Sequence, residues 1–242
     1  MFPGAEAVLF DMGGTLIDYP LPAWPAVAAR FARAFLRGIV VGESRGLPPA
    51  ASVPPAKESP SHRARARPDA PLAYRTTMAL RRMIRSVSSS TVPRLGELAT
   101  RPLVAGGRLV PDAPATLADL RERGHRLGLV SNTPWGTPDY LWTGQLERFG
   151  LARFFEVTCF SSQVGFRKPD PRLFRAALET LGVPAERALF VGDDPVDDVA
   201  GARAAGIPSV WVDRGHRPPP DPPPDLRIRR LADLPDCLDE RG

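Results

Sequence analysis

Short apolar runs and longer amphipathic stretches alternate along the chain from residue 112 onward. The apolar runs suit buried strands, and the amphipathic stretches carry their apolar residues at helical spacing. A glycine follows each predicted helix, as is common where an α-helix ends. Strands that alternate with such helices predict right-handed βαβ units and a parallel sheet. The predicted helices cover residues 115–123, 139–149, 170–181 and 199–205, and the predicted strands cover residues 126–130, 155–159, 188–191 and 209–212, the last of which ends the core.

One more apolar run, Ala7–Phe10, leads directly into Asp11 and is followed by the glycine pair Gly13-Gly14. This pattern is typical of a buried parallel strand that ends at a loop. In an open α/β sheet, ligands bind beyond the carboxyl ends of the strands. Asp11 is therefore a candidate active-site residue. The alternative interpretation is a loop carboxylate that only caps the turn after it.

Residues 18–108 interrupt this alternation. Their apolar spacing predicts one helix at residues 23–41 and another at 72–87. The stretch between them, about 42–71, is rich in Pro, Ser, Ala and Arg and nearly lacks large apolar side chains, so we predict a flexible excursion. The predicted fold is α/β. It has a Rossmann-like, doubly wound parallel-sheet core (1–17 and 109–215), a mainly helical insertion (18–108), and a Pro-rich linker with a C-terminal tail (216–242).

The composition is that of a soluble globular protein, with 43% hydrophobic and 24% charged residues among 242. No apolar run approaches the roughly 18 residues of a membrane span. No basic stretch precedes the first apolar run, so we expect no signal peptide. Cys159 and Cys237 are too few for a disulfide framework or a zinc site, which favours the reducing cytoplasm.

The net charge of +5 comes almost entirely from arginine, because Lys57 and Lys168 are the only lysines. Arginines cluster between residues 63 and 85, where Tyr74 is the one aromatic residue. Nucleic-acid-binding surfaces combine basic residues with recognisable motifs or stacking aromatics. The arginine bias also runs through the whole chain, so we do not expect a nucleic-acid partner. Attraction of an anionic substrate is the simpler explanation.

Several polar side chains stand just after predicted strands or at the start of a helix. They are Asp11, Ser131, Lys168, and Asp193 with Asp197 and Asp198. Around a phosphoryl group each would have a role. Asp11 could attack phosphorus and form an acyl phosphate. Mg²⁺ would offset the repulsion between the two anions, with Asp193 and the carbonyl of Gly13 as further oxygen ligands. Lys168 suits phosphoryl oxygens or an ionised Asp11, and Ser131 offers a hydroxyl where charge develops.

Each of these assignments has a simpler competitor. Ser131 and Asn132 could merely cap the next helix. Lys168 could be an ordinary surface lysine, although it precedes Pro169 in a chain with almost no lysine. The acidic run 193–198 could be a solvated turn, but its density favours a bound cation. The three histidines, His62, His125 and His216, show no ligand spacing and are interpreted as structural or exposed.

Four ordered segments resemble the motifs of the haloacid dehalogenase superfamily: Phe10-Asp11-Met12-Gly13-Gly14-Thr15-Leu16, Val130-Ser131-Asn132-Thr133, Arg167-Lys168-Pro169-Asp170, and Val191-Gly192-Asp193-Asp194 through Asp198. The resemblance implies that Asp11 is the nucleophile, assisted by Ser131 and Lys168, and that residues 18–108 are a helical cap that selects the substrate. The implied phosphate-binding residues are Thr15, Ser131, Asn132 and Lys168. The implied Mg²⁺ ligands are Asp11, the Gly13 carbonyl, Asp193 and Asp198, with Asp197 as the alternative to Asp198.

The chain departs from the commonest pattern of this superfamily at Gly13, where an acid/base aspartate usually stands. Such a group typically contributes about 10²–10⁴ in rate. Two branches also lack it. The phosphonate-cleaving branch needs a cap lysine, for which only Lys57 is available, and the dehalogenase branch needs no acidic metal motif. The leading hypothesis is a cytoplasmic, Mg²⁺-dependent phosphatase of a small phosphorylated metabolite, acting through an aspartyl phosphate. The competing hypothesis is a catalytically weak protein that binds a phosphorylated ligand or partner, and a dehalogenase or phosphonatase is the less favoured alternative. The oligomeric state is not predicted.

Overall fold

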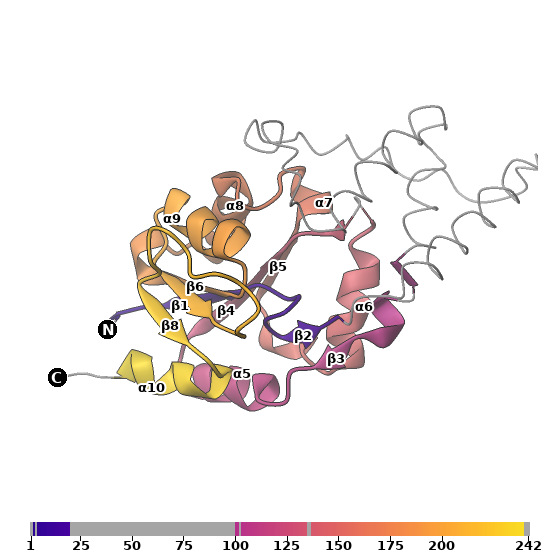
Figure 1. The fold of residues 1–242 in the computed structure, drawn as a ribbon, viewed down its shortest axis with the longest axis horizontal. Helices are drawn as coiled ribbons and strands as arrows, with labels where there is room; N and C mark the ends of the chain where they lie inside the picture. The colour runs from indigo at the N-terminus through magenta and orange to yellow at the C-terminus, as the bar shows by residue number, and fades with distance from the viewer. Residues whose placement is uncertain (1, 3, 20–99, 102, 135–136, 240–242) are drawn as a thin grey trace, which may run out of the picture.

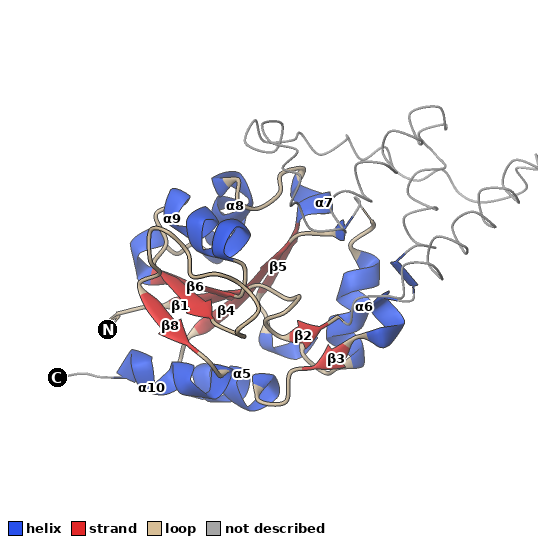
Figure 2. Ribbon diagram, viewed as in Figure 1, coloured by secondary structure: helices blue, strands red, loops and turns tan. Residues whose placement is uncertain are grey.

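A six-stranded parallel sheet forms the centre of the computed structural model, which describes residues 2, 4–19, 100–101, 103–134 and 137–239. The strand order is β5-β4-β1-β6-β7-β8, and helices lie on both faces (Figures 1 and 2). The predicted α/β, Rossmann-like parallel sheet is therefore confirmed. The strands are β1 (Ala7–Phe10), β4 (Arg126–Ser131), β5 (Val157–Phe160), β6 (Ala188–Gly192), β7 (Ser209–Val212) and β8 (Leu226–Ile228).

Both faces of the sheet are packed, as its strand sequences require. Successive residues of a strand point to opposite faces, and β1 is buried along its whole length. Val8 and Phe10 belong to the core cluster that includes Leu117 of helix α5 (Ala113–Glu122), whereas Leu9 packs with Phe174 of helix α8 (Pro171–Leu181) in the other cluster. This two-sided burial explains why the central strands read as continuous apolar runs rather than alternating ones.

The order of the strands places a topological switch beside β1. From β1 the chain adds β4 and then β5 on one side, and afterwards it adds β6, β7 and β8 on the other side. Strands β1 and β6 are neighbours whose onward connections run in opposite directions. A crevice beyond the carboxyl ends of such a pair is where open α/β sheets bind ligands. Asp11 and Asp193 follow these two strands directly.

A short antiparallel pair joins the two ends of the insertion. Strand β2 (Ile17–Asp18) pairs with β3 (Arg108–Leu109), so that Ile17 lies opposite Leu109 and Asp18 opposite Arg108. Figure 1 shows the pair beside the main sheet, next to helix α6 (Tyr140–Arg148). The predicted helices at 23–41 and 72–87 and the predicted excursion at 42–71 lie outside the described residues. The division into core and cap thus stays a prediction.

The predicted helices of the core are present within one or two residues, apart from the one near residue 199. The glycines after α5, α6 and α8 have positive φ values, which helix ends favour. Strand β4 is one residue longer than predicted and β5 begins two residues later. Further helical segments include α7 (Ser161–Val164), α9 (Gly201–Ala204) and α10 (Leu234–Asp239), a π-helical turn η4 (Pro195–Ala200), and the 3₁₀ turns η2 (Ala152–Phe154), η3 (Ala185–Arg187) and η5 (Leu231–Asp233).

Two predictions about the C-terminal half are wrong. The helix predicted at 199–205 begins four residues earlier, because Pro195 fits the first turn and the Asp194 side chain accepts hydrogen bonds from the N–H groups of Val196 and Asp197. Ser209–Val212 is not the last core strand, because β8 pairs with it in parallel beyond the proline-rich segment.

The residues after 216 also contribute to the core, although the sequence suggested only a linker and a tail. The core cluster that packs against α5 includes three buried residues from this part of the chain, Ile228, Leu231 and Leu234. The Asp225 side chain accepts hydrogen bonds from the N–H and hydroxyl groups of Ser209, which fixes β8 beside β7. No helix in the described part of the chain is long and apolar enough to cross a membrane.

Candidate active site

Polar side chains meet at one edge of the sheet, where three parallel strands end. Asp11 follows β1, Ser131 is the last residue of β4, and Asp193 follows β6. The strands are in register, with Phe10 opposite both Leu129 and Val191. The N–H of Asp11 continues this register and donates to the carbonyl of Val191 at 2.9 Å. The fold thus brings together three side chains that follow or end separate strands in the sequence: Asp11, Ser131 and Asp193.

Lys168 lies at the centre of this group. Its Nζ is 2.5 Å from Oδ1 of Asp11 and 2.7 Å from Oδ1 of Asp198, and the side chain is only 2% exposed. Burial alone would lower the pKa of the ammonium, but the two carboxylates outweigh it and hold that pKa above its usual value. Lys168 is therefore a fixed positive charge, not the solvated surface lysine that was the alternative interpretation.

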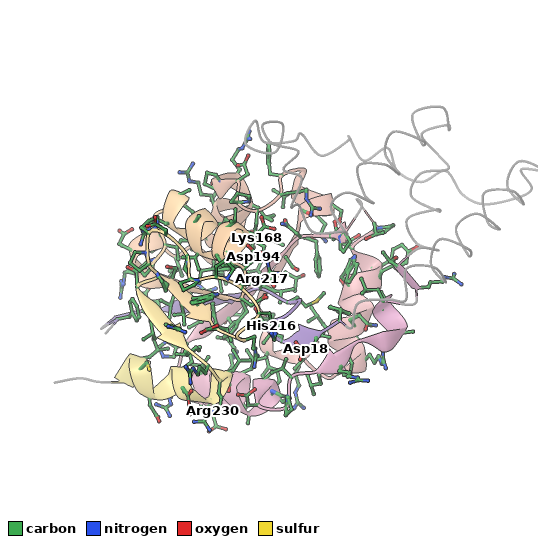
Figure 3. The ribbon with its side chains drawn as sticks, in the orientation of Figure 1. Asp18, Lys168, Asp194, His216, Arg217 and Arg230 are labelled. Carbon is green, nitrogen blue, oxygen red and sulfur yellow. The ribbon has the colours of Figure 1, made fainter. Side chains whose placement is uncertain are left out.

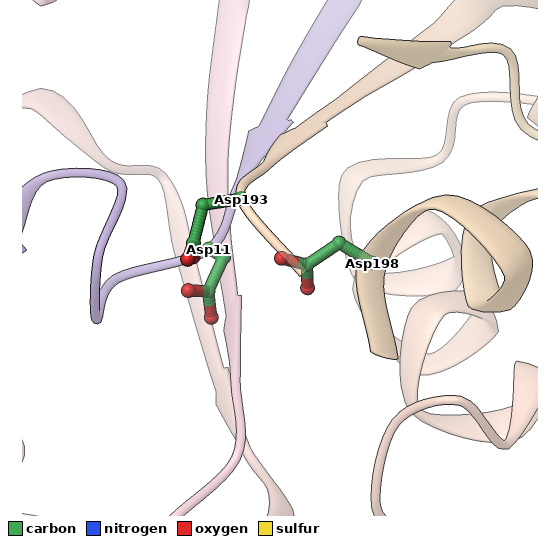
Figure 4. Close-up of side chains that lie close together, drawn as sticks. All are labelled: Asp11, Asp193 and Asp198. Carbon is green, nitrogen blue, oxygen red and sulfur yellow. The ribbon is translucent and has the colours of Figure 1, made fainter. Parts of the chain in front are cut away.

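Three carboxylates gather beside this single ammonium, and two of them are in contact with it. One oxygen of each of Asp11, Asp193 and Asp198 lies within 4.8 Å of the others, and all three residues are buried. Figure 4 shows them converging from the ends of β1 and β6 and from the turn η4. Burial, reinforced by the charge of Asp11, raises the pKa of Asp193 to about 7. Burial likewise raises the pKa of Asp198, against the opposing effect of Lys168. When all three carboxylates are ionised they outnumber the one ammonium, and a cation would offset that excess of negative charge.

The turn η4 decides which of its aspartates faces the cluster. Asp198 points inward, is 1% exposed, and holds Lys168 with Oδ1 while Oδ2 accepts the N–H of Asp194 at 2.9 Å. Asp197 instead accepts a hydrogen bond from the Asn132 side chain at 3.0 Å. Of the two candidates that the sequence left open, the structure therefore places Asp198 in the cluster.

Asn132 locks the Lys168 segment to the end of β4. Its Oδ1 accepts the N–H of Lys168 at 2.8 Å, and its Nδ2 donates to the carbonyl of Lys168 at 3.2 Å and to Asp197. Both the oxygen and the nitrogen of this side-chain amide therefore have hydrogen-bond partners. Its geometry is that of a positioning residue, and phosphate binding by Asn132 stays a prediction.

Of the two glycines after Asp11, only Gly14 occupies a position that requires glycine. Gly14 has a φ of +84°, and a Cβ atom placed on it would lie 2.6 Å from Oδ2 of Asp193, so both backbone and space require glycine there. Gly13 does not have a positive φ, and a Cβ on it would make only ordinary contacts with the Tyr19 ring. The hydroxyl of Thr15 is buried and lies 3.4 Å from Oδ1 of Asp193.

Ser131 and Lys168 both act on the same oxygen of the nucleophile candidate. The Ser131 hydroxyl donates to Oδ1 of Asp11 at 3.2 Å, and the Lys168 ammonium contacts that same atom. Among the described residues these are the hydrogen bonds to the Asp11 carboxylate, so Oδ2 is left for another interaction. A carboxylate fixed through one oxygen presents the other in a defined direction, as a nucleophile requires.

Sequence reasoning missed Arg217, which reaches the cluster from the loop after β7 (Figure 3). Its guanidinium lies 2.6 Å from Oδ2 of Asp194 and 3.5 Å from Oδ2 of Asp193. The side chain is 47% exposed, so it covers the outer side of the acidic group. Nothing in the sequence singled it out, because it is one of many arginines in the chain and directly precedes a proline-rich stretch.

The family model for haloacid dehalogenase-like hydrolases matches residues 5–206. Among curated proteins, the phosphoserine phosphatase of Thermus thermophilus is 50% identical over 127 residues, which are 52% of this chain and 49% of that protein. The phosphoglycolate phosphatase of Rhodospirillum rubrum is 43% identical over 122 residues, or 50% and 48% of the two chains. These matches span about half the length of the relatives.

Solved structures with the same fold cover nearly the whole chain. A HAD phosphatase from Thermococcus onnurineus has a TM-score of 0.62 at 24% identity, over 97% of this chain and 98% of that one. A 2-haloacid dehalogenase from Pseudomonas syringae pv. tomato has a TM-score of 0.60 at 24% identity, over 96% and 97%. Both phosphatases and dehalogenases share this architecture, so the fold alone does not choose between the two reactions.

Proposed function

This chain belongs to the haloacid dehalogenase-like hydrolase family, and on that premise we propose that it is a Mg²⁺-dependent phosphatase of a small phosphorylated metabolite. The observation that carries the proposal is the buried contact of Lys168 with both Asp11 and Asp198, beside a third carboxylate. The relatives named above act on phosphoserine and phosphoglycolate, which supports a small phosphate monoester as the substrate class.

Asp11 is the proposed nucleophile. Its carboxylate is held through Oδ1 by Lys168 and Ser131, which leaves Oδ2 to attack phosphorus. The new Asp11–phosphorus bond forms as the bond from phosphorus to the leaving oxygen breaks. This divides one difficult displacement into two easier ones. Lys168 and Ser131 then stand next to the phosphoryl oxygens as fixed donors where negative charge accumulates.

The donor set fits Mg²⁺, which prefers oxygen ligands from one or two carboxylates and keeps several waters. Asp11 and Asp193 are the carboxylates best placed to hold the ion, together with the backbone carbonyl of Gly13. Within the part of the chain that the structure describes, the Asp193 carboxylate makes only long polar contacts, with Thr15 and Arg217. Both oxygens of Asp198 are instead engaged, by Lys168 and by the N–H of Asp194. In this proposal Asp198 chiefly positions Lys168. The bound cation would neutralise the nucleophile and the phosphoryl group as they meet.

The second half of the reaction returns Asp11 to its starting state. Water attacks the phosphorus of the aspartyl phosphate, inorganic phosphate leaves, and the carboxylate is regenerated. Gly13 has no side chain that could donate or accept a proton in either half of the reaction. That absence is the specific observation behind the second candidate function, a weakly catalytic protein that binds a phosphorylated ligand.

A phosphate-release screen over phosphorylated metabolites, with and without Mg²⁺, separates these functions. The phosphatase proposal expects Mg²⁺-dependent release from at least one monoester and its loss in Asp11→Asn. No release from any monoester, combined with saturable binding of a phosphorylated metabolite, would favour the binding protein. Halide release from a 2-haloacid without Mg²⁺ would instead make the chain a dehalogenase.

A further inference from the structure

The Tyr19 ring lies where a side chain at position 13 would project. A Cβ atom placed on Gly13 would be 3.6 Å from Cδ2 and 3.7 Å from Cε2 of Tyr19, both ordinary contact distances. Gly13 is two residues beyond the proposed nucleophile. Tyr19 therefore borders the part of the site in which this chain has no acid/base side chain.

Three neighbours fix the position of this ring. It packs edge to face on Trp142, with ring centroids 5.8 Å apart and an interplanar angle of 85°. On another side, a Cβ atom on Gly107 would come within 2.9 Å of Cε1 of Tyr19, so glycine is needed there to admit the ring. Tyr19 directly follows β2, whose pairing with β3 holds its backbone.

The hydroxyl of Tyr19 is buried and has no hydrogen-bond partner among the described residues. Buried tyrosine hydroxyls usually have one, and an unpaired buried polar group costs about 1–3 kcal/mol. Burial, and after it the negative charge of Asp11, raise the pKa of this phenol, while Arg148 opposes them. The hydroxyl thus remains a protonated donor and lacks an acceptor.

We propose that the Tyr19 hydroxyl donates a hydrogen bond to the leaving-group oxygen of the substrate. It would do so on the side of Asp11 that faces Gly13, which has no acid/base side chain. This rests on the proposed phosphatase function. As the bond from phosphorus to the leaving oxygen breaks, negative charge builds on that oxygen, and a preorganised donor stabilises it. Tyr19 keeps its proton throughout. A basic leaving alkoxide takes its proton from water, and the hydroxide so formed is consumed when the aspartyl phosphate is hydrolysed.

A structural role for the same hydroxyl predicts a different outcome. The Oε1 atom of Gln145 is also buried and has no partner in the described ranges of the chain. It lies 3.0 Å from the Cβ position of Gly107, near Cε1 of Tyr19. A water molecule between Tyr19 and Gln145 would satisfy both groups. In that case the two side chains would support the junction of the insertion and would not act on the substrate.

The test compares Tyr19→Phe with wild type on substituted phenyl phosphates whose leaving groups differ in basicity. We expect little change, at most about threefold in kcat/KM, for p-nitrophenyl phosphate, whose leaving group needs no help. We expect the loss to grow with leaving-group pKa to about tenfold or more for phenyl phosphate and for alkyl phosphates. The slope of log kcat/KM, which reports the step in which the leaving group departs, against leaving-group pKa should therefore become steeper.

Two further variants distinguish a hydrogen bond from Tyr19 to the leaving group from a role of Tyr19 in packing alone. Gln145→Met removes the other unpartnered atom and should leave the slope unchanged. Gly13→Asp should add little to wild type but restore alkyl phosphate hydrolysis in Tyr19→Phe. Parallel plots for Tyr19→Phe and wild type, or the same slope change in Gln145→Met, would overturn the proposal while leaving the phosphatase function intact. A wild type inactive on every phosphate would instead remove the function on which it rests.

Discussion

Gly14 leaves the space that the carboxylate of Asp193 occupies. A Cβ atom on Gly14 would come within 2.6 Å of Oδ2 and 2.7 Å of Oδ1 of that carboxylate. The loop after β1 and the end of β6 therefore pack closely together at a residue without a side chain. The positive φ of Gly14 adds a second requirement for glycine.

Gly14→Ala should consequently lose both stability and activity. The left-handed backbone costs a residue with a Cβ about 1–2 kcal/mol, and the clash displaces Asp193 in addition. Gly124→Ala is the matched control, because Gly124 has a φ of +88° and open space around its Cβ position. We expect a similar backbone cost in thermal unfolding for both variants, but weakened Mg²⁺ activation only for Gly14→Ala. Equal Mg²⁺ titrations would show that Asp193 tolerates the displacement.

Asp11→Asn should reduce phosphate release to background without unfolding the protein. The amide keeps the shape but loses the anion that attacks phosphorus, and it also relieves repulsion with the other buried carboxylates. Asp18→Asn, an exposed change in the same segment, serves as the control. Turnover, measured with thermal unfolding, checks this prediction. Activity of Asp11→Asn above a tenth of wild type would remove Asp11 from the nucleophilic role.

The cation-free protein should become less stable as the pH rises from about 4 to about 7. Asp193 has an ordinary pKa of 3.8 and a folded pKa of about 7, so across this window the folded state keeps a proton that the unfolded state has released. Stability therefore falls with rising pH, and the loss is complete above pH 7. Mg²⁺ should raise the melting temperature more at pH 8 than at pH 5. Asp193→Asn should flatten both dependences, and unchanged curves for this variant would assign them to other groups.

Arg217→Gln should tighten Mg²⁺ binding. The guanidinium lies 3.5 Å from Asp193, and its positive charge opposes an incoming cation. Because Arg217 is half exposed and solvent screens it, we expect a change of roughly two- to fivefold in Kd by titration calorimetry, which is less than about 1 kcal/mol. Arg227→Gln removes the same charge from an exposed pair with Asp213 and should leave Kd unchanged. Weaker binding by Arg217→Gln would mean that Arg217 organises the acidic loop instead.

The sequence predicted the central part of the site because simple rules act there. Asp11 and Asp193 each follow a run of buried apolar residues, and parallel strands end at the same edge. Side-chain partners were harder to foresee. The inward direction of the Asp198 side chain depends on the capping of η4 by Asp194. The hydrogen bonds of the Asn132 side chain depend on Lys168, which lies 36 residues further along the chain.

The C-terminal part of the sheet escaped prediction for a physical reason. Strand β8 has only three residues and follows a proline-rich segment, so it offers no apolar period to detect. Its place is set by long-range contacts, chiefly the hydrogen bonds of Asp225 with Ser209. Arg217 and Tyr19 were missed in the same way, because their importance lies in what they approach and not in a local pattern.

The central position of β1 also sets the order in which the protein can fold as it is made. Its two partners, β4 and β6, begin at Arg126 and Ala188, far downstream of Ala7. At translation rates of about 5–20 residues per second, β1 waits roughly 10–40 seconds for its second neighbour. Until β4 has been made, these four consecutive apolar residues have no strand to pair with, and until β6 has been made one edge of β1 stays unpaired. Shielding of this segment during synthesis, by the ribosome, by a chaperone or by transient collapse, should therefore affect the yield of native protein.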